Sequence, residues 1–442
     1  MSPEVLTIAS FVLLIVLVLT GFPTALAIMG AGLACGLIGM GHAFPYMIPQ
    51  RILTGTLSIY IFAAVPLFIF MGTLLERTGI MERSYSVMYK WLGGLNGGLA
   101  VSSVLICTLF AATTGVIGAS VTTMGLLAIP AMLKRGYDKS LASGAVCAGG
   151  TLGQLIPPSV MLIMYAPMAG VSVVNMFAGA ILPGLLLSAL FCIYIIIRCR
   201  MNPKMGPAIA VEERERFWTK KSLTGGAKYF APPIFIIVAV LGTIIVGIAS
   251  PTEAGAMGVA AALILMAVLR RLKWQLVKEA AHSTLLATCM VILIAMSASL
   301  FTGAFLGSGC GFVVADFLLG LGLGKWGIFI ITLVIITILG MFIDWIGVLY
   351  ILVPIFGPIL ISLGFDPLWT GLVICIALQL SFLTPPFAYA IFYLRGLKIG
   401  LEIGDLYRGV IPFVILQAIG TALCIAFPQI PLWLPSILYK GF

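Results

Sequence analysis

Charged residues are scarce in this 442-residue chain. Asp, Glu, Lys and Arg together make up 9% of it, whereas a typical soluble domain contains about 25%. Hydrophobic residues account for 62%, and the mean hydropathy is +1.21. A water-soluble fold could not hide so much apolar side chain, because its surface must stay polar enough to remain dispersed. The composition therefore predicts a protein whose solvent is the lipid bilayer.

Motifs for several kinds of chemistry are also missing. The nine cysteines form no CxxC pair and no metal-ligand spacing, and the two histidines, His42 and His282, stand alone. Gly324-Lys325 is followed by Trp326 rather than Ser or Thr, so the sequence has no Walker A motif. No His-rich or carboxylate-rich set suggests catalysis inside the membrane. We therefore expect no enzyme, no cofactor, no transition metal and no ATP hydrolysis.

Long apolar runs recur along the whole chain. A membrane-spanning helix needs about 20 apolar residues, and candidate segments include 4–21, 57–75, 176–197, 229–249 and 409–427. The first is not expected to be a cleaved signal, because no basic region precedes it. The net charge is +10, but the basic residues cluster between spans, which indicates cytoplasmic loops rather than nucleic-acid binding. We predict an all-α, polytopic protein of the bacterial inner membrane, surrounded by lipids.

Residue patterns of the first half recur 228 residues later. Gly136-Tyr137-Asp138 matches Gly364-Phe365-Asp366, and Pro157-Pro158 matches Pro385-Pro386. A register that stays constant over such a distance indicates an internal duplication. We therefore divide the chain into a first repeat (1–197), a cytoplasmic linker (198–228), a second repeat (229–427) and a C-terminal tail (428–442).

Basic residues suggest how the two repeats are oriented. The first span has no basic residue before it, so the N-terminus is expected in the periplasm, whereas the basic linker is placed in the cytoplasm. Equivalent segments then run in opposite directions, with Pro251–Ala254 as an external turn and Arg51 on the periplasmic side. Two inverted repeats around a central site are typical of secondary transporters.

Each repeat contains a break expected at the tip of a re-entrant hairpin. In the first, Ala112–Ser120 joins two short apolar pieces whose far ends both carry cytoplasmic charge. Its partner is Gly340–Gly347, entered from the outside. That segment includes Asp344, and a carboxylate within an apolar run is functional by default. The alternative is an interfacial Asp344 near the mouth of the hairpin.

A second pair of breaks contains the diprolines, within Gly149–Ser159 and Gln379–Pro386. Two adjacent prolines remove two N–H donors and clash with the preceding turn, so the helix must unwind. Unwound backbone at membrane depth is tolerated only inside protein or beside a cavity, where its carbonyls can hold a cation. A lone proline is usually only a kink, but paired breaks at equivalent places favour a functional site.

The sequence resembles the large, DctM-like membrane subunit of the tripartite ATP-independent periplasmic (TRAP) transporters over nearly its full length. The resemblance rests on six segments: Pro66–Gly72, Ala119-Ser120, Gly149–Ser159, Ser250–Gly255, Gly364–Pro367 and Thr384–Pro386. It implies Na+-driven import of a small organic acid, such as a dicarboxylate or sialic acid, which a periplasmic solute-binding protein delivers. It also implies a small four-helix membrane subunit, expected as a separate chain.

The same resemblance implies an elevator-type carrier of the ion-transporter superfamily. The hairpins and broken helices would move with the solute, while arm helices at 43–56 and 270–283 stay fixed. Arg51 in the first arm would serve as an interfacial anchor or contact the binding protein. A stand-alone, ion-coupled organic-anion symporter of the same architecture is the alternative, and a channel is disfavoured because the broken helices argue against a continuous pore.

On this reading the breaks supply two kinds of site. Na+ is a hard cation that prefers oxygen ligands, and we predict one Na+ site in each repeat. The predicted Na+ ligands are Thr114, Gly115, Gly118, Ser120, Gly149 and Thr151 in the first repeat, and Gly340, Asp344, Gly347, Ser381 and Thr384 in the second. The solute carboxylate is predicted between the broken helices, beside Gln154, Pro157, Pro158, Ser159, Pro385 and Pro386.

Overall fold

The fold is helical throughout the part of the chain that the structure describes. The structure is a computed structural model that describes residues 2–114, 117–210, 220–386 and 388–438; the side chains of 111–114 and 220–225 are not described. Helices are the only regular secondary structure within these ranges, and nine of them are long and apolar enough to cross a membrane. The predicted all-α, polytopic class is confirmed.

The first half runs from the N-terminus to the end of a long helix at Met201. Its helices are α1 (Pro3–Leu19), α2 (Thr24–Met40), α3 (Phe44–Ile52), α4 (Ala64–Arg77), α5 (Ile80–Leu92), α6 (Gly98–Thr114), α7 (Ile117–Lys134), α8 (Lys139–Thr151), α9 (Val160–Met168) and α10 (Val173–Met201). Short helical turns connect some of them: η1 (Gly41–Ala43), η2 (Leu53–Leu57), η3 (Tyr60–Ala63) and η4 (Leu152–Gln154).

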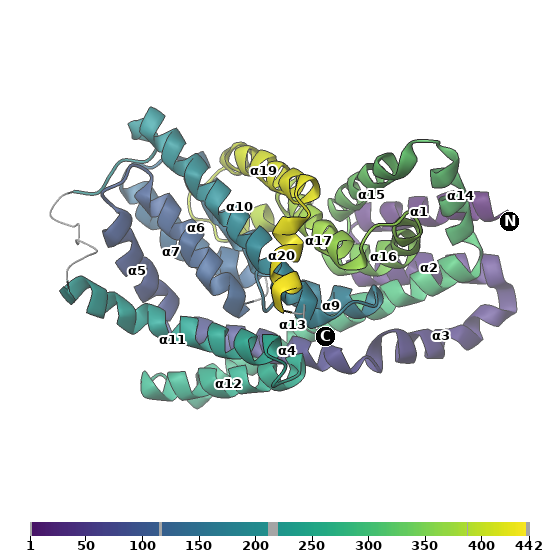
Figure 1. Ribbon diagram of the computed structural model, residues 1–442, viewed down its shortest axis with the longest axis horizontal. Helices are drawn as coiled ribbons and strands as arrows, with labels where there is room; N and C mark the ends of the chain where they lie inside the picture. Colours follow the sequence, from purple (N-terminus) through teal and green to yellow (C-terminus); the bar gives the residue numbers. More distant parts are fainter. Residues whose placement is uncertain (1, 115–116, 211–219, 387, 439–442) are drawn as a thin grey trace.

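The second half follows after a short turn, η5 (Pro203–Met205). Its helices are α11 (Lys220–Ile245), α12 (Pro251–Val268), α13 (Trp274–Gly307), α14 (Cys310–Gly320), α15 (Gly324–Gly340), α16 (Trp345–Ser362), α17 (Pro367–Leu383), α18 (Tyr389–Gly396), α19 (Ile403–Ala426) and α20 (Gln429–Leu438). Figure 1 shows the first hairpin, α6 and α7, on the left and the second, α15 and α16, on the right, with α9, α17 and α20 between them.

Helix boundaries repeat at the offset read from the sequence. The 18-residue helices α7 and α16 begin and end 228 residues apart. In the turns that follow them, Gly136 and Gly364 both have positive φ, a conformation that residues with a Cβ rarely adopt. Asp138 and Asp366 then cap α8 and α17, each accepting from the backbone N–H three residues later. The duplication therefore extends to the local geometry.

Charge distinguishes these equivalent turns. The first turn contains Arg135 and is flanked by Lys134 and Lys139, whereas residues 363–366 include no Lys or Arg. Basic loops belong on the cytoplasmic side. This difference supports opposite orientations for the two halves.

The linker is shorter than the predicted 198–228, because α10 extends to Met201 and α11 begins at Lys220. Its first part is attached to the first half by backbone hydrogen bonds. The Gly97 N–H donates to the Gly206 carbonyl at 2.8 Å, and the Asp138 N–H donates to the Met205 carbonyl at 2.9 Å. Chain continuity and these bonds together hold the start of the linker against α6 and α8.

The prediction of an external turn at Pro251–Ala254 is wrong, because these residues form the first turn of α12. Ser250 caps the helix: its hydroxyl accepts from the Glu253 N–H, and the Glu253 carboxylate accepts from the Ser250 N–H. This capping box satisfies N–H groups that a helix start leaves unpaired. The turn before α12 lies at 246–250 instead.

The two predicted arms are both helical, but they are built differently. Residues 43–56 fall in α3 and η2, whereas 270–283 fall largely in α13, which continues without interruption to Gly307. Helix α13 packs along α2, where an ideal Cβ placed on Gly32 would lie only 2.8 Å from the Phe301 Cα. It also contacts α4 and α16, and therefore joins both halves (Figure 1).

Helices α8 and α19 approach each other backbone to backbone at Gly144 and Gly409. A Cβ on Gly144 would overlap the Gly409 carbonyl, and a Cβ on Gly409 would overlap the Ser140 carbonyl. Small residues permit such close packing in membranes, where dispersion and polar contacts hold helices together.

We expect Gly144→Ala to destabilise the protein by about 1–3 kcal/mol, because the added methyl forces α8 and α19 apart. Thermal unfolding of the purified protein in detergent measures this effect. Gly242→Ala is the matched control, since Gly242 also lies inside a helix, and a Cβ there would meet no atom within 4 Å. Equal melting temperatures for the two variants would contradict the close approach.

Candidate functional site

In the first predicted hairpin, Gly115 lies outside the described residues, as does the side chain of Thr114. Helix α7 begins at Ile117. Gly118 and Ser120 therefore lie in its first turns rather than in the break itself. The Gly118 carbonyl accepts from the Thr122 hydroxyl at 2.7 Å.

The end of α8 is packed between the two helices of the first hairpin. A Cβ on Gly149 would lie 3.0 Å from the Cys107 Cβ of α6, and one on Gly150 would overlap the Val121 side chain of α7. Thr151 ends α8, and its buried hydroxyl donates to the Ala148 carbonyl at 2.8 Å. A hydroxyl that donates its proton keeps lone pairs that can accept a cation.

The first diproline segment is unwound and fully enclosed. The chain leaves helical structure between η4 and α9, and Gln154, Pro157, Pro158 and Ser159 are all buried. The Ser159 hydroxyl donates to the Gln154 carbonyl and caps α9 by accepting from the Leu162 N–H. The side-chain Oε1 of Gln154 is buried and has no hydrogen-bond partner among the described residues. A buried acceptor of this kind requires an explanation, and a bound ion or hydrogen-bond donor is a common one.

The second hairpin places Asp344 deep in the protein. Its side chain is only 3% exposed and caps α16, accepting from the Ile346 N–H at 3.2 Å. Tyr389, at the start of α18, lies beside the carboxylate. The Asp344 carboxylate is therefore enclosed by protein. Gly340 ends α15 and Gly347 lies in the first turn of α16, so both flank the break.

The tip of the second hairpin touches the second broken helix. A Cβ on Gly340 would lie 2.6 Å from the Ser381 Oγ, which belongs to the last turn of α17. The Thr384 hydroxyl donates to the Leu380 carbonyl at 2.7 Å, where α17 ends. Pro385 and Pro386 follow and are exposed, unlike the buried diproline of the first half. The two equivalent breaks therefore differ in their surroundings.

Two links join the broken helices of the two halves. The Gln379 side chain of α17 donates to the Thr151 carbonyl of α8 at 3.0 Å, and these two residues are equivalent in the duplication. Gln417 of α19 donates to the Gln379 Oε1 at 2.9 Å and to the Ile376 carbonyl at 3.1 Å. This buried amide network holds the end of α8 against α17.

The second link runs through aromatic side chains. A Cβ on Gly118 would lie 2.8 Å from the Tyr393 ring, and Tyr393 stacks on Tyr389, the neighbour of Asp344. The structure thus brings the start of α7 close to the second hairpin through α18. Sequence reasoning missed both Gln417 and Tyr389. A buried amide in an apolar run could have revealed Gln417, but no local signal marks Tyr389.

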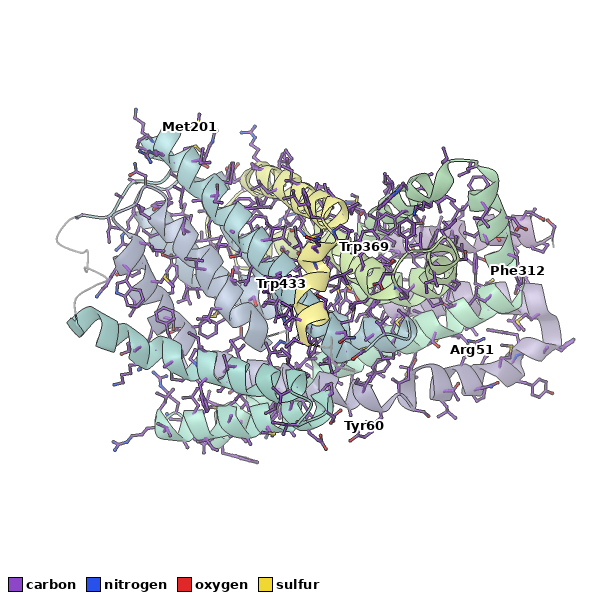
Figure 2. The ribbon with its side chains drawn as sticks, viewed as in Figure 1. Arg51, Tyr60, Met201, Phe312, Trp369 and Trp433 are labelled. Atoms are coloured by element: carbon purple, nitrogen blue, oxygen red, sulfur yellow. The ribbon has the colours of Figure 1, made fainter. Side chains whose placement is uncertain are left out.

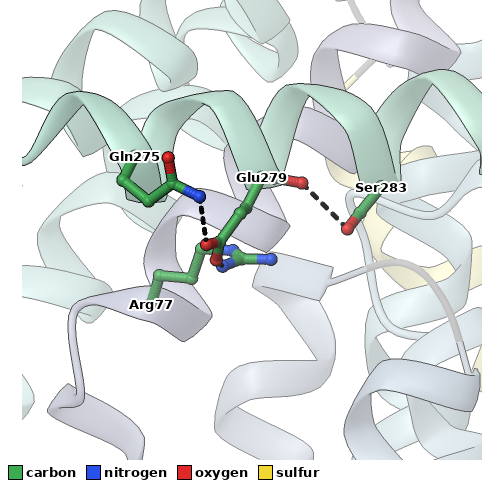
Figure 3. A network of polar contacts seen from close by, with 4 residues as sticks. All are labelled: Arg77, Gln275, Glu279 and Ser283. Atoms are coloured by element: carbon green, nitrogen blue, oxygen red, sulfur yellow. Dashed lines mark hydrogen bonds and ion pairs between the residues drawn. The ribbon is translucent and has the colours of Figure 1, made fainter.

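Polar contacts also connect the first hairpin to α4, and α4 to α13, the helix that contains the second predicted arm. The Thr123 hydroxyl of α7 donates to the Glu76 carboxylate of α4 at 2.9 Å. The next residue, Arg77, pairs with Glu279 of α13, which also accepts from Gln275 at 2.9 Å (Figure 3). The Arg77–Glu279 pair therefore joins α4 to α13, while Glu76 joins α4 to the first hairpin.

Comparison with known proteins gives consistent matches. The family described as the tripartite ATP-independent periplasmic transporter, DctM component, matches residues 11–430. The C4-dicarboxylate TRAP transporter large permease protein DctM of Pseudomonas aeruginosa is 30% identical over 85% of this chain and 86% of its own length. The ectoine/5-hydroxyectoine TRAP transporter large permease protein UehC of Ruegeria pomeroyi is 30% identical over 97% of this chain and 99% of its own.

Two further matches extend this comparison. The isethionate TRAP transporter permease protein DctMQ of Oleidesulfovibrio alaskensis is 29% identical over 94% of this chain, and the match covers 66% of that longer protein. Among solved structures, the YdaH transporter of Alcanivorax borkumensis superposes with a TM-score of 0.61 over 98% of both chains, at 14% identity. At that identity, the superposition speaks for the fold alone.

We expect Gln379→Leu to cost about 1–3 kcal/mol of stability, because the buried Thr151 carbonyl loses its donor. Thermal unfolding in detergent measures the loss. Gln50→Leu removes an exposed amide and is the control. In a double-mutant cycle with Gln417→Leu, the two effects should not add, since the residues share one network. Additive losses would show that Gln379 and Gln417 act independently.

Proposed function

This chain belongs to the DctM-component family of the tripartite ATP-independent periplasmic transporters, and we propose that it imports a small organic anion at the expense of a Na+ gradient. The chain is a transporter permease of the membrane, not an enzyme. The observation that carries the proposal is the pairing of each hairpin with a broken helix whose polar oxygens are buried. That arrangement provides cation ligands without a cluster of carboxylates.

The anionic nature of the solute is supported by what the relatives carry. Their names specify C4-dicarboxylate, ectoine and isethionate, and each of these molecules bears a carboxylate or a sulfonate. The unwound segments end at the starts of α9 and α18, and a helix N-terminus favours an anion. We place the acidic group of the solute between these starts, with Gln154 and Ser159 on the first side.

The Na+ ligands are proposed from the oxygens that remain available. The hydroxyls of Thr151, Ser381 and Thr384 donate to carbonyls of their own helices and keep free lone pairs. Asp344 supplies a carboxylate oxygen to the second site only. The first site would consist of backbone and hydroxyl oxygens beside Ser120, which suits a monovalent hard cation.

The proposed elevator movement is suggested by the polar contacts that join α4, α13 and the first hairpin. Arg77 and Glu279 connect α4 with α13, so this pair belongs to a frame that can remain fixed (Figure 3). The Glu76–Thr123 bond joins that frame to the first hairpin. If the hairpins and broken helices move together as an elevator, this bond must break while the Gln379–Thr151 bond is retained.

We expect transport to require the whole tripartite assembly. Proteoliposomes that contain this chain, the small four-helix subunit and a loaded periplasmic binding protein should accumulate radiolabelled organic acid only with an inward Na+ gradient. Omission of the binding protein should abolish uptake. Uptake by this chain alone would favour the stand-alone symporter, and equal uptake in K+ and Na+ would refute Na+ coupling.

We expect Ser120→Ala and Thr384→Ala each to raise the Na+ concentration for half-maximal uptake by several-fold, because each removes one oxygen ligand. The matched control is Thr332→Ala, since Thr332 is also buried and donates to a carbonyl four residues before it. Na+ titrations of uptake measure the effect. Unchanged titrations for both variants would show that the two hydroxyls do not bind Na+.

A further inference from the structure

Two cavities occupy equivalent places in the two halves, each beside an arm. The Glu76 cavity, of about 240 Å³, is lined in part by Ala119, Ser283 and Ala287. The Arg51 cavity, of about 170 Å³, is lined in part by Gly55 and Ile59, which lie 228 residues before Ser283 and Ala287. The duplication therefore produces a matched pair of cavities with different side chains.

The charges in the two cavities differ. The equivalent of Arg51 in the second half is Glu279, which pairs with Arg77 beside the Glu76 cavity. Arg51 forms no ion pair with any residue that the structure describes. Arg51 lies on α3, beside α13 (Figure 2). A Cβ on Gly303 of α13 would come within 2.7 Å of the Arg51 Nε. Arg51 thus places a positive charge at a cavity wall with no counter-ion among the described side chains.

A second unsatisfied group lines the same cavity. The Tyr350 hydroxyl is buried and has no hydrogen-bond partner among the described residues, and Tyr350 as a whole is 4% exposed. Nearby, the Ser299 hydroxyl makes only a long bond, at 3.3 Å, to the Arg51 carbonyl. A guanidinium and a phenolic O–H in the walls of one small space form a set that recognises a carboxylate or sulfonate.

The walls of the Arg51 cavity come partly from the first arm and α13, and partly from the second hairpin and the broken helix α9. Arg51 and Gly55 belong to the first arm, and Ser299 belongs to α13, whereas Tyr350 belongs to the second hairpin. Met168, at the end of the broken helix α9, completes the wall. The cavity is therefore next to one of the two helices between which the solute site was placed.

We propose that the Arg51 cavity is a second anion subsite, in which the carboxylate or sulfonate of the solute contacts Arg51 and the Tyr350 hydroxyl. This inference rests on the proposed transport of a small organic anion. The subsite would concentrate the solute beside the arm, because a guanidinium with no ion-pair partner among the described residues attracts anions.

Charge-selective labelling of Ser299→Cys tests the proposal in the full chain. Cys289, the exposed cysteine among those described, is first replaced by Ser, which leaves the other described cysteines buried. The anionic sulfonatoethyl and the cationic trimethylammonioethyl methanethiosulfonates then compete for the new thiol. We expect Arg51→Gln to lower the anionic-to-cationic ratio of labelling rates by about ten-fold, and Arg51→Lys to preserve most of it.

Two controls separate this cavity from general charge effects. Arg271→Gln removes an exposed basic residue and should leave the ratio unchanged. Ser283→Cys reports on the Glu76 cavity and should show no preference for the anionic reagent. A ratio at Ser299→Cys that is insensitive to Arg51→Gln, or an absence of labelling there, would overturn the proposal.

The source of the anion is tested by protection. Millimolar succinate or isethionate should slow labelling of Ser299→Cys in purified protein. If phosphatidylglycerol protects the thiol and neither small anion does, the cavity binds a lipid phosphate and the solute subsite is refuted.

In proteoliposomes, Arg51→Gln and Tyr350→Phe should raise KM for solute with little change in kcat or in the Na+ titration. Failure of Na+ coupling alone would leave the labelling result unaffected.

Discussion

The requirement that every backbone polar group find a partner inside the membrane governs this structure. No water is available there to pair with an exposed N–H or carbonyl, so unwound backbone is tolerated only where protein or a cavity surrounds it. The unwound segments of the hairpins and broken helices meet this requirement because other helices pack around them. The end of α8 lies between α6 and α7, and the second hairpin lies against α17. Hydroxyls of Ser and Thr then satisfy several of the carbonyls that the helix ends leave free.

The sequence was informative wherever a feature depends on neighbouring residues. The unwinding at both diprolines could be predicted because it follows from local backbone chemistry, and the offset of 228 could be read from matching residues in the two halves. The exact restart of a helix could not be predicted. Helix α7 already includes Ile117, which places Gly118 and Ser120 in helical structure.

Features that depend on distant residues were not predictable. The burial of one diproline and the exposure of the other cannot be read from two identical dipeptides. The network of Gln379 and Gln417 joins residues on different helices, as does the contact of Tyr393 with Gly118. The duplication also conceals divergence, since equivalent positions can carry opposite charges, as Arg51 and Glu279 do. The two equivalent cavities therefore present different chemistry.

Helix α13 has 34 residues without a break. At about 1.5 Å per residue it is about 50 Å long, whereas the hydrocarbon layer of a bilayer is only about 30 Å thick. Its polar beginning must therefore reach into the headgroup region, or the rod must tilt steeply. Because this rod touches α2, α4 and α16, its inclination is shared with both bundles. The thickness of the bilayer therefore influences the tilt of α13 and, through its contacts, the orientation of both bundles.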